Sequence, residues 1–434
     1  MLKFKLLALL ITIITILAPG LAHAKWSFTP RLYVEGHYDD NIFLTERNEE
    51  DDFVTTVSPG INLQYSDPTT EVNLDYEYQR FWYADFSELD TDAHRARALA
   101  RKDFWQWFGA GIRETFIRSE DPLELTGLPE FERPSVRIGI RNRYTRNIVE
   151  PEATFRFGEN RSIRLGYRNH ILRNEADDIA DRDENAINGL LTFRFDIHNG
   201  IEVFYEHINQ EFHQTFPPEP DRDFKGDEAR GRYTYYFNPI TSAFLEYRYY
   251  HRDFDRTTPG FFDYDVHDPR IGLSRDLYEN VKFTASAGYA VRDAEGDRDD
   301  EGTFSGLGEL SGRYKQLTVS LLGEAGFDQD FLSAESFGFY EFWRGGFNGR
   351  YQFLKRLWGE GFFYIERNRF VDIRRRDTYL RARGALGYQV LKWLFLSVEY
   401  RFDDRDSNIP FESYRDNRYF GRITVQYDIA EHFQ

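Results

Sequence analysis

The sequence predicts an all-β fold, a transmembrane antiparallel up-and-down β-barrel of about 20 strands, with short periplasmic turns and long acidic surface loops. Short turn signals recur about every 40 residues, and two runs of alternating residues, separated by a longer loop, lie between successive turns. The aromatic content is 17%, yet the mean hydropathy is only −0.63. The turn signals centre on Asp67, Phe104, Glu159, Asn199, Pro239, Glu279, Lys315, Lys355 and Lys392.

The chain begins with a segment typical of a secretory signal. Met1–Ala24 has a basic start, an apolar stretch from Leu6 to Leu17, and small residues at a cleavage site that ends in Ala24. The alternative, a membrane anchor helix, is disfavoured because the apolar stretch is short for a span. We therefore expect cleavage near Ala24, a single barrel domain over residues 25–434, and location in the cell outer membrane.

Strict alternation predicts that each strand has one apolar face and one polar face. In Val281–Val291 the odd positions are apolar or aromatic, whereas most even positions are small or polar. Leu394–Phe402 and Ile423–Ile429 repeat the pattern. A two-sheet sandwich would show the same period, but about 20 strands exceed what one sandwich contains. Closure into a barrel also removes the exposed sheet edges.

The ends of the chain set the strand count. Phe28–Leu44 as the first strand and Tyr419–Ile429 as the last give 20 strands, and 18 is the alternative because the first pair has the weakest pattern. Either number predicts a barrel wide enough for an aqueous lumen. Two aromatic girdles are expected, with Trp82 and Trp343 near the long loops and Trp105, Trp107, Trp358 and Trp393 near the short turns.

The net charge of −18 is concentrated in three predicted loops. Glu46–Asp52 carries a net charge of −4, and Glu175–Glu184 and Asp293–Glu301 each carry −5. Such a surface repels phosphate, which disfavours nucleic acid as a partner. The runs are either solvated loop tips or sites where divalent cations bridge carboxylates to lipopolysaccharide.

Charged residues within strands are expected to face the lumen, because an Arg or Glu facing lipid is costly. They either form a cross-strand network that only stiffens the wall, or line a path for hydrated solutes. Phe204, Phe362 and Tyr364 share this parity and could provide a track for sugar rings. The candidate pore-lining residues are Arg156, Arg164, Arg168, Arg194, Arg232, Arg248, Arg292, Arg313, Arg350, Arg383, Arg401, Glu202, Glu206, Glu246, Glu324, Glu360 and Glu399.

Catalytic and metal-binding motifs are not found. The chain has no Cys, and its His residues fall in unrelated strands and loops. We expect no enzyme activity, no cofactor and no metal site. The few residues before the first strand leave no room for the plug domain of an energised transporter.

Three regions resemble a known family. Tyr144–Gly166 (YTRNIVEPEATFRFGENRSIRLG) and the segment from Phe193 onward resemble the family called putative beta-barrel porin 2. The N-terminal FTPRLYVEGHYDDNIFLT, with its core Asp39-Asp40-Asn41-Ile42-Phe43, is similar to the opening strand of that family. The resemblance implies a porin-like outer-membrane barrel, and some members are associated with exopolysaccharide or exosortase systems. It implies no catalytic residues.

These patterns predict an outer-membrane channel for hydrophilic solutes, or the exit pore of an exopolysaccharide export system. The alternative is a non-conducting structural or adhesion barrel whose acidic loops bind cations or lipopolysaccharide. Expected partners are outer-membrane lipid and lipopolysaccharide, with periplasmic polysaccharide-export components in the export case. The oligomeric state stays open.

Overall fold

The computed structural model describes residues 25–176, apart from 121–141, and residues 179–429, apart from 214–222, 256–261, 295–299 and 330–337. The expected signal Met1–Ala24 therefore lies outside the described residues. Most of the segment Ser119–Pro134, which could narrow the lumen, also lies outside them.

The described residues form twenty strands and one short 3-10 helix, η2 (Ser87–Leu89). No helix among them has the length and hydropathy to cross a membrane. The strands are β1 (Lys25–Asp39), β2 (Asp52–Ser66), β3 (Thr70–Tyr83), β4 (Thr91–Trp105), β5 (Phe108–Ser119), β6 (Tyr144–Gly158), β7 (Arg161–Asn174), β8 (Asp181–Arg194), β9 (Asn199–His213), β10 (Phe224–Asn238), β11 (Thr241–Phe254), β12 (Tyr264–Tyr278), β13 (Val281–Ala294), β14 (Glu301–Tyr314), β15 (Leu317–Gln329), β16 (Phe339–Leu354), β17 (Leu357–Phe370), β18 (Arg376–Leu391), β19 (Leu394–Ser407) and β20 (Tyr414–Gln426).

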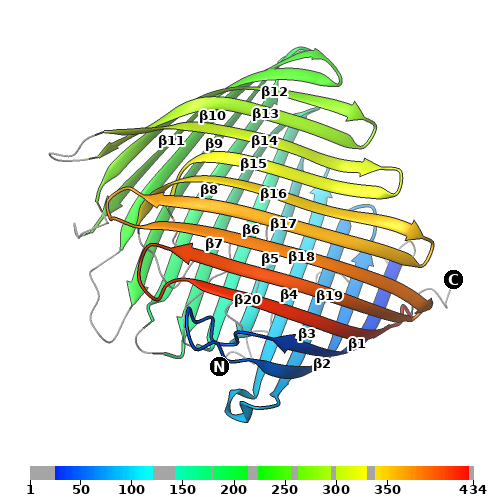
Figure 1. Cartoon of the computed structure of the whole chain (residues 1–434). Helices are drawn as coiled ribbons and strands as arrows, with labels where there is room; N and C mark the ends of the chain where they lie inside the picture. The colour runs from blue at the N-terminus through cyan, green and yellow to red at the C-terminus, as the bar shows by residue number, and fades with distance from the viewer. Residues whose placement is uncertain are drawn as a thin grey trace.

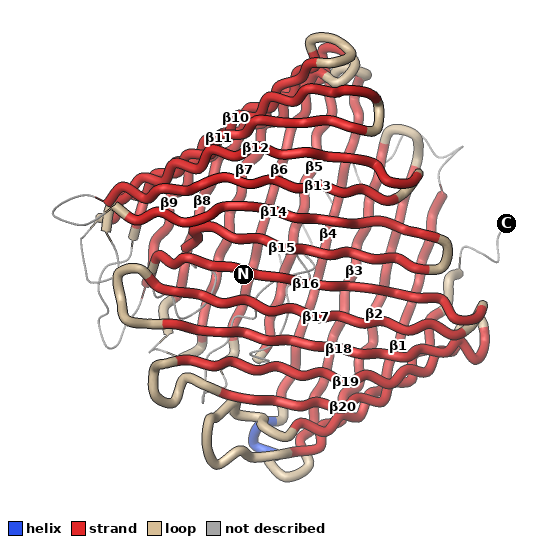
Figure 2. Tube along the Cα trace, turned by 45° about the horizontal axis from the view of Figure 1, so that its top comes forward, coloured by secondary structure: helices blue, strands red, loops and turns tan. Residues whose placement is uncertain are grey.

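Every strand pairs antiparallel with its neighbours in sequence, and the first strand also pairs with the last (Figure 1). The β1–β20 ladder runs from Arg31 opposite Gln426 to Asp39 opposite Arg418. The sheet is therefore closed, as the tube in Figure 2 also shows. The predicted fold and the count of 20 strands are confirmed, and the alternative of 18 is wrong.

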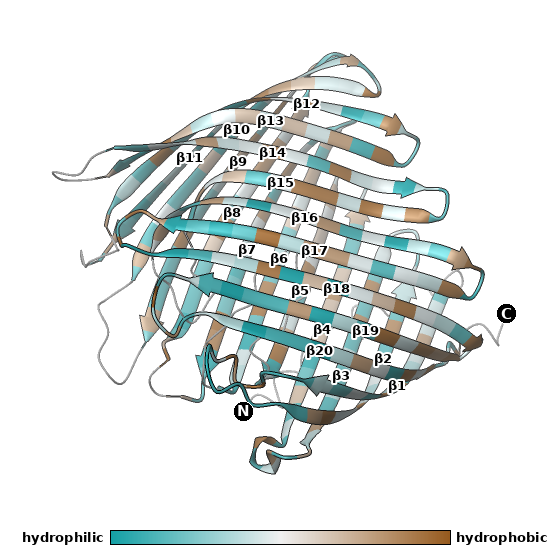
Figure 3. Cartoon of the chain, in the orientation of Figure 1, coloured by the Kyte–Doolittle hydropathy of each residue, from teal (hydrophilic) through white to brown (hydrophobic). Residues whose placement is uncertain are grey.

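The outer wall is apolar along most of its height. Leu245, Ile271, Tyr289 and Val398 each keep more than half of their surface exposed, and all four lie on the outer parity of their strands. Figure 3 shows the resulting mixture of hydropathy along each strand. So large an exposed apolar surface fits a hydrocarbon environment and not water.

All nine predicted short turns are present at one end of the barrel, the short-turn end, and the long loops lie at the other, the loop end. The first turn shows the local chemistry. Asp67 accepts hydrogen bonds from the Tyr65 hydroxyl at 2.7 Å and from the backbone N–H of Thr69 and Thr70 at 2.7 and 2.8 Å. The bond from Tyr65, helped by those from the turn, lowers the pKa of Asp67 to about 2.

The first strand ends at Asp39 and not at Leu44, because the next residues turn to meet the last strand. The Asn41 side chain is fully buried; its amide donates to the carbonyls of Thr45 and Arg415, both at 2.8 Å. The Asp40 carboxylate accepts from the backbone and side chain of Asn417 at 2.6 and 2.8 Å. The Asp39–Phe43 motif thus joins the first loop to the last strand, where the barrel closes.

Replacing Asn41 by alanine is expected to lower the free energy of unfolding by about 1–3 kcal/mol, because the carbonyls of Thr45 and Arg415 and the Thr45 N–H lose their partner. Denaturant titration of the folded protein in detergent measures the change. Asn408→Ala is the matched control, since its amide bonds a carbonyl at an exposed position. Equal losses in the two variants would show that Asn41 is not a closure residue.

Two expectations need correction. The acidic runs are not confined to loop tips: Asp52 is buried at the start of β2, where it accepts from the backbone N–H of Ala84, Asp85 and Phe86. Trp358 does not belong to an outer girdle, because it shares the inward parity of β17 and the Arg350 guanidinium lies 5.2 Å from its ring centre. Trp105 and Trp107 do stack at the short-turn end, with centroids 5.1 Å apart.

Candidate functional site

The inward face of the wall is the candidate site. Along each strand, exposed outer residues alternate with residues that point into the barrel. All seventeen predicted pore-lining residues lie at these inward positions. Most of them lie in ion pairs between neighbouring strands. Arg194 and Arg313, at the short-turn end, instead donate to backbone carbonyls of their own turns.

The pairs are close and follow the order of the strands around the barrel. Arg168 contacts Glu184 at 2.7 Å and Glu206 at 3.2 Å. Further pairs join neighbouring strands: Arg232–Glu246 (2.5 Å), Arg248–Glu228 (3.8 Å), Arg344–Glu324 (2.5 Å), Arg350–Glu360 (3.1 Å) and Arg383–Glu360 (3.9 Å). Arg156 of β6 contacts Asp103 of β4 at 2.8 Å, and Arg401 contacts Glu399 of the same strand.

Many of these guanidinium groups also lie over aromatic rings of the inward face. Arg232 lies 4.4 Å from the ring centre of Phe244, and Arg194 lies 4.2 Å from that of Tyr236. Such contacts hold a guanidinium in a fixed plane while its edge stays available for hydrogen bonds. The inward face is therefore rigid, polar and charged.

The same contacts change the role expected for the aromatic residues. The guanidinium of Arg230 lies 5.6 Å from the ring centre of Phe204, and that of Arg383 lies 5.9 Å from that of Phe362. Tyr364 is only 2% exposed. The three rings support charged groups or fill space, and they do not form a continuous exposed track for sugars.

The inward face is wetter near the short turns than near the loops. Arg156 and Arg164 keep 43% and 49% of their side-chain surface exposed. At the loop end, Arg182 and Arg405 are only 1% and 2% exposed. The described inward side chains are therefore packed more tightly at the loop end.

An aromatic cluster forms part of this packing at the loop end. Phe224, Phe254, Tyr264, Phe327 and Phe339, from five different strands, are all buried together at the loop end. The Tyr264 and Phe339 rings lie 4.7 Å apart, although β12 and β16 are not adjacent in the sheet. These rings fill the inward space beside β10–β12 and β15–β16.

A short segment of the β17–β18 loop, residues 371–375, packs against the filled region. Val371 contacts the aromatic cluster, and Ile373 contacts a second cluster that contains Tyr340 and Phe342. The Asp372 carboxylate accepts two hydrogen bonds from Arg292 of β13, at 3.1 and 2.9 Å. We call residues 371–375 the inward segment.

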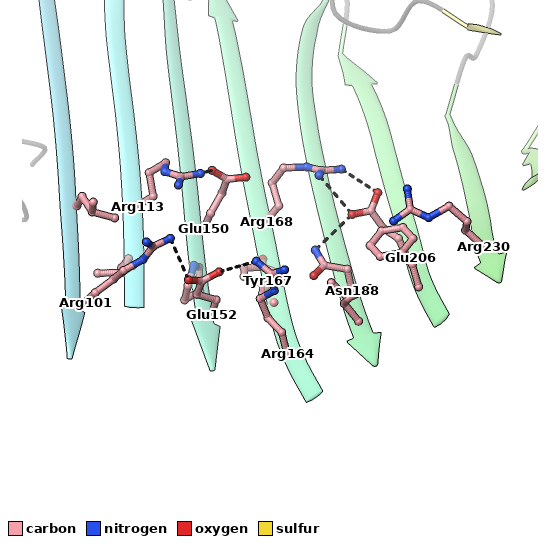
Figure 4. Close-up of a pocket in the computed structure, with 16 residues that line it drawn as sticks. Arg101, Arg113, Glu150, Glu152, Arg164, Tyr167, Arg168, Asn188, Glu206 and Arg230 are labelled. Atoms are coloured by element: carbon pink, nitrogen blue, oxygen red, sulfur yellow. Dashed lines mark hydrogen bonds and ion pairs between the residues drawn. The ribbon is translucent and has the colours of Figure 1, made fainter. Parts of the chain in front are cut away.

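Between the wet short-turn end and the filled loop end, the wall of β4–β10 contains a hollow of about 350 Å³ (Figure 4). Its charged residues point toward one another across neighbouring strands (Figure 4). Leu99, Leu190 and Phe204 supply apolar surface. The charged lining residues are Arg101, Arg113, Glu150, Glu152, Arg164, Arg168, Glu206 and Arg230.

Three of these eight charged residues, Arg164, Arg168 and Glu206, were predicted from the sequence, and the other five were not. The sequence around Arg101 does contain a pattern that indicates its face. Along β4, alanines alternate with Arg95, Arg97, Leu99 and Arg101. Glu150 and Glu152 also lie two positions apart in β6. Their meeting in one hollow depends on the register between strands.

Among the described residues, no group of three or more His, Asp or Glu side chains is placed to hold a metal ion. The charged pairs, the hollow and the shape of the inward face make up the candidate site.

Comparisons with known proteins agree with this architecture. The family model described as "Putative beta-barrel porin 2" matches residues 208–427, half of the chain. No curated protein matches. The chain is similar to the ferric enterobactin receptor PfeA of Pseudomonas aeruginosa, with 9% identity and a TM-score of 0.54 over 92% of this chain and 81% of that chain.

The siderophore receptor PirA is a second similar structure. The protein from Pseudomonas aeruginosa is 11% identical, with a TM-score of 0.52 over 92% of this chain and 80% of that chain. The PirA of Acinetobacter baumannii is 9% identical, with a TM-score of 0.51 over 93% of this chain and 80% of that chain. At such low identity these likenesses show the fold alone.

Proposed function

The chain belongs to the putative beta-barrel porin 2 family, and from this premise we propose that it is a passive outer-membrane channel for hydrophilic solutes. The observation that carries the proposal is the inward face, on which charged pairs and a polar hollow occupy the wall below the filled loop end. The inward side chains of a barrel of about eight strands fill its interior, whereas twenty strands enclose a wider space. Polar groups on that face replace part of the hydration shell of a passing solute.

The proposal extends to hydroxyl-rich solutes such as oligosaccharides. Mixed charges in closely spaced pairs offer both donors and acceptors along the wall. Export of an exopolysaccharide is the same passage through the barrel, with a longer sugar chain as the solute. It requires that the inward segment move, because a chain must pass the loop end.

A non-conducting structural barrel is the second candidate, and the filled loop end favours it. Arg405 is 2% exposed and lies 3.5 Å from Asp377 and 3.0 Å from Glu412. Arg375 contacts the same two carboxylates. Buried networks of this kind fix a structure more than they transport a solute. The two candidates differ in whether water and solutes cross the loop end.

Liposome swelling separates the two candidates. Folded protein is reconstituted into liposomes, which are then diluted into iso-osmotic arabinose, maltose or raffinose. The channel proposal predicts swelling that slows as the sugar becomes larger. Swelling no faster than that of protein-free liposomes, with protein that migrates as a folded band on a gel, would favour the structural barrel.

A further inference from the structure

We propose that the hollow on β4–β10 is a binding site for organic carboxylates, of which a uronic acid unit of an acidic glycan is the type that also fits the proposed channel. This inference rests on the proposed function in one respect: the ligand reaches the hollow through the proposed channel. The site itself follows from charge, geometry and surface chemistry.

The hollow is basic within an acidic protein. Five arginines and three glutamates line it, an excess of two positive charges, whereas the whole chain has a net charge of −18. A concave, partly desolvated surface concentrates the field of such charges. Anions are therefore attracted to this part of the wall, and cations are not.

Three of the arginines are held loosely. Arg101 and Arg164 share Glu152, at 3.4 and 3.9 Å, and Arg113 lies 3.6 Å from Glu150. Each keeps nearly half of its side-chain surface exposed. A guanidinium has five N–H donors, so a single distant carboxylate leaves most of them available to a ligand.

Arg168 provides the contrast within the same hollow. It forms hydrogen bonds with Glu184 at 2.7 Å and with Glu206 at 3.2 and 3.3 Å, and is only 28% exposed. Its role is to fix the wall between β7 and β9. The hollow thus combines one fixed arginine with three that can turn toward a ligand.

Arg230 supplies a further donor on the opposite side of the hollow. Its guanidinium lies 5.6 Å from the ring centre of Phe204, and it forms no ion pair with any described residue. The ring holds the plane of the guanidinium and leaves the N–H edge available. A planar carboxylate matches such an edge with two parallel hydrogen bonds.

The apolar part of the hollow favours an organic anion over an inorganic one. Leu99, Leu190 and Phe204 offer no hydrogen bonds from their side chains, but they can contact the carbon skeleton of a ligand. A volume of about 350 Å³ lies at the lower end of the range for small-molecule sites. A carboxylate joined to a sugar ring fits both surfaces.

Isothermal titration calorimetry with the whole folded protein in detergent at low ionic strength tests the site. Trigalacturonic acid is the probe, and maltotriose is the neutral probe of equal length. We expect heat of binding for trigalacturonic acid alone, and an affinity that falls as salt is added. Inorganic phosphate, titrated separately, is expected to bind at least about tenfold more weakly, because it cannot use the apolar surface.

Single variants locate the binding. Arg101→Gln, Arg164→Gln and Arg230→Gln are each expected to weaken the binding of trigalacturonic acid about tenfold or more, because each removes a charged hydrogen-bond donor. Lys282→Gln is the matched control, since it removes one positive charge from an exposed inward position of β13, outside the hollow. Its binding is expected to equal that of the unmodified protein. Migration as a folded band verifies each variant.

The outcomes distinguish this inference from the proposed function. Equal binding of the two trisaccharides, equal binding of phosphate, or full affinity in all three hollow variants would overturn the carboxylate site, even if the protein conducts. Selective binding in a protein that fails the swelling assay would support the site and reject the channel. The comparison of the two trisaccharides needs no variant, so a misfolded mutant does not affect it.

Discussion

Replacing Asp372 by alanine is expected to lower the free energy of unfolding by about 3–5 kcal/mol, because it leaves the buried Arg292 guanidinium without its carboxylate. It also releases the inward segment from β13. We therefore expect the loop end to open and single-channel conductance to rise. Denaturant titration measures the first effect, and planar-bilayer recording measures the second.

The control for this variant is an exposed pair of similar chemistry. Arg415 is 67% exposed and lies 3.1 Å from Asp404. Asp404→Ala is expected to cost about 1 kcal/mol or less and to leave the conductance unchanged. An Asp372→Ala protein as stable as the Asp404→Ala protein, with unchanged conductance, would show that the inward segment does not restrict the loop end.

Replacing Ala285 by arginine is expected to lower the free energy of unfolding by about 2–4 kcal/mol, because the charge would face hydrocarbon. Ala285 lies opposite Leu273 and Gly308, both on the outer parity of their strands. Heat resistance of the folded band on a gel, followed by denaturant titration in lipid vesicles, measures the loss.

Ser286→Arg is the matched control, one residue further along β13. Its neighbours Gly272 and Leu307 lie on the inward parity, so the new side chain can reach water in the lumen. We expect a much smaller loss than for Ala285→Arg. If both variants lose the same stability, the assignment of the two faces is wrong.

The strands and turns were predictable because they depend on local patterns. Alternation has a period of two residues, and the turns at Glu159, Glu279 and Lys355 use short polar segments between apolar runs. The end of the first strand was not predictable in this way, because its cause is distant in sequence. Asn41 bonds the carbonyl of Arg415 in β20.

The candidate site was predictable only in part. Parity alone places Arg164 and Glu206 on the inward face, but it does not say which inward residues meet. Arg292 and Asp372 are 80 residues apart and come from a strand and a loop. Their pairing depends on the way in which the wall folds around the aromatic cluster, and no local pattern contains that information. The hollow likewise depends on the register of seven adjacent strands.

Single-channel recording in planar lipid bilayers tests the central claim most directly, which is that the closed wall surrounds a continuous aqueous path. The account predicts stepwise openings whose conductance rises in proportion to the conductivity of the bathing salt. Protein that is folded and inserted, yet gives no openings at any applied voltage, would contradict it.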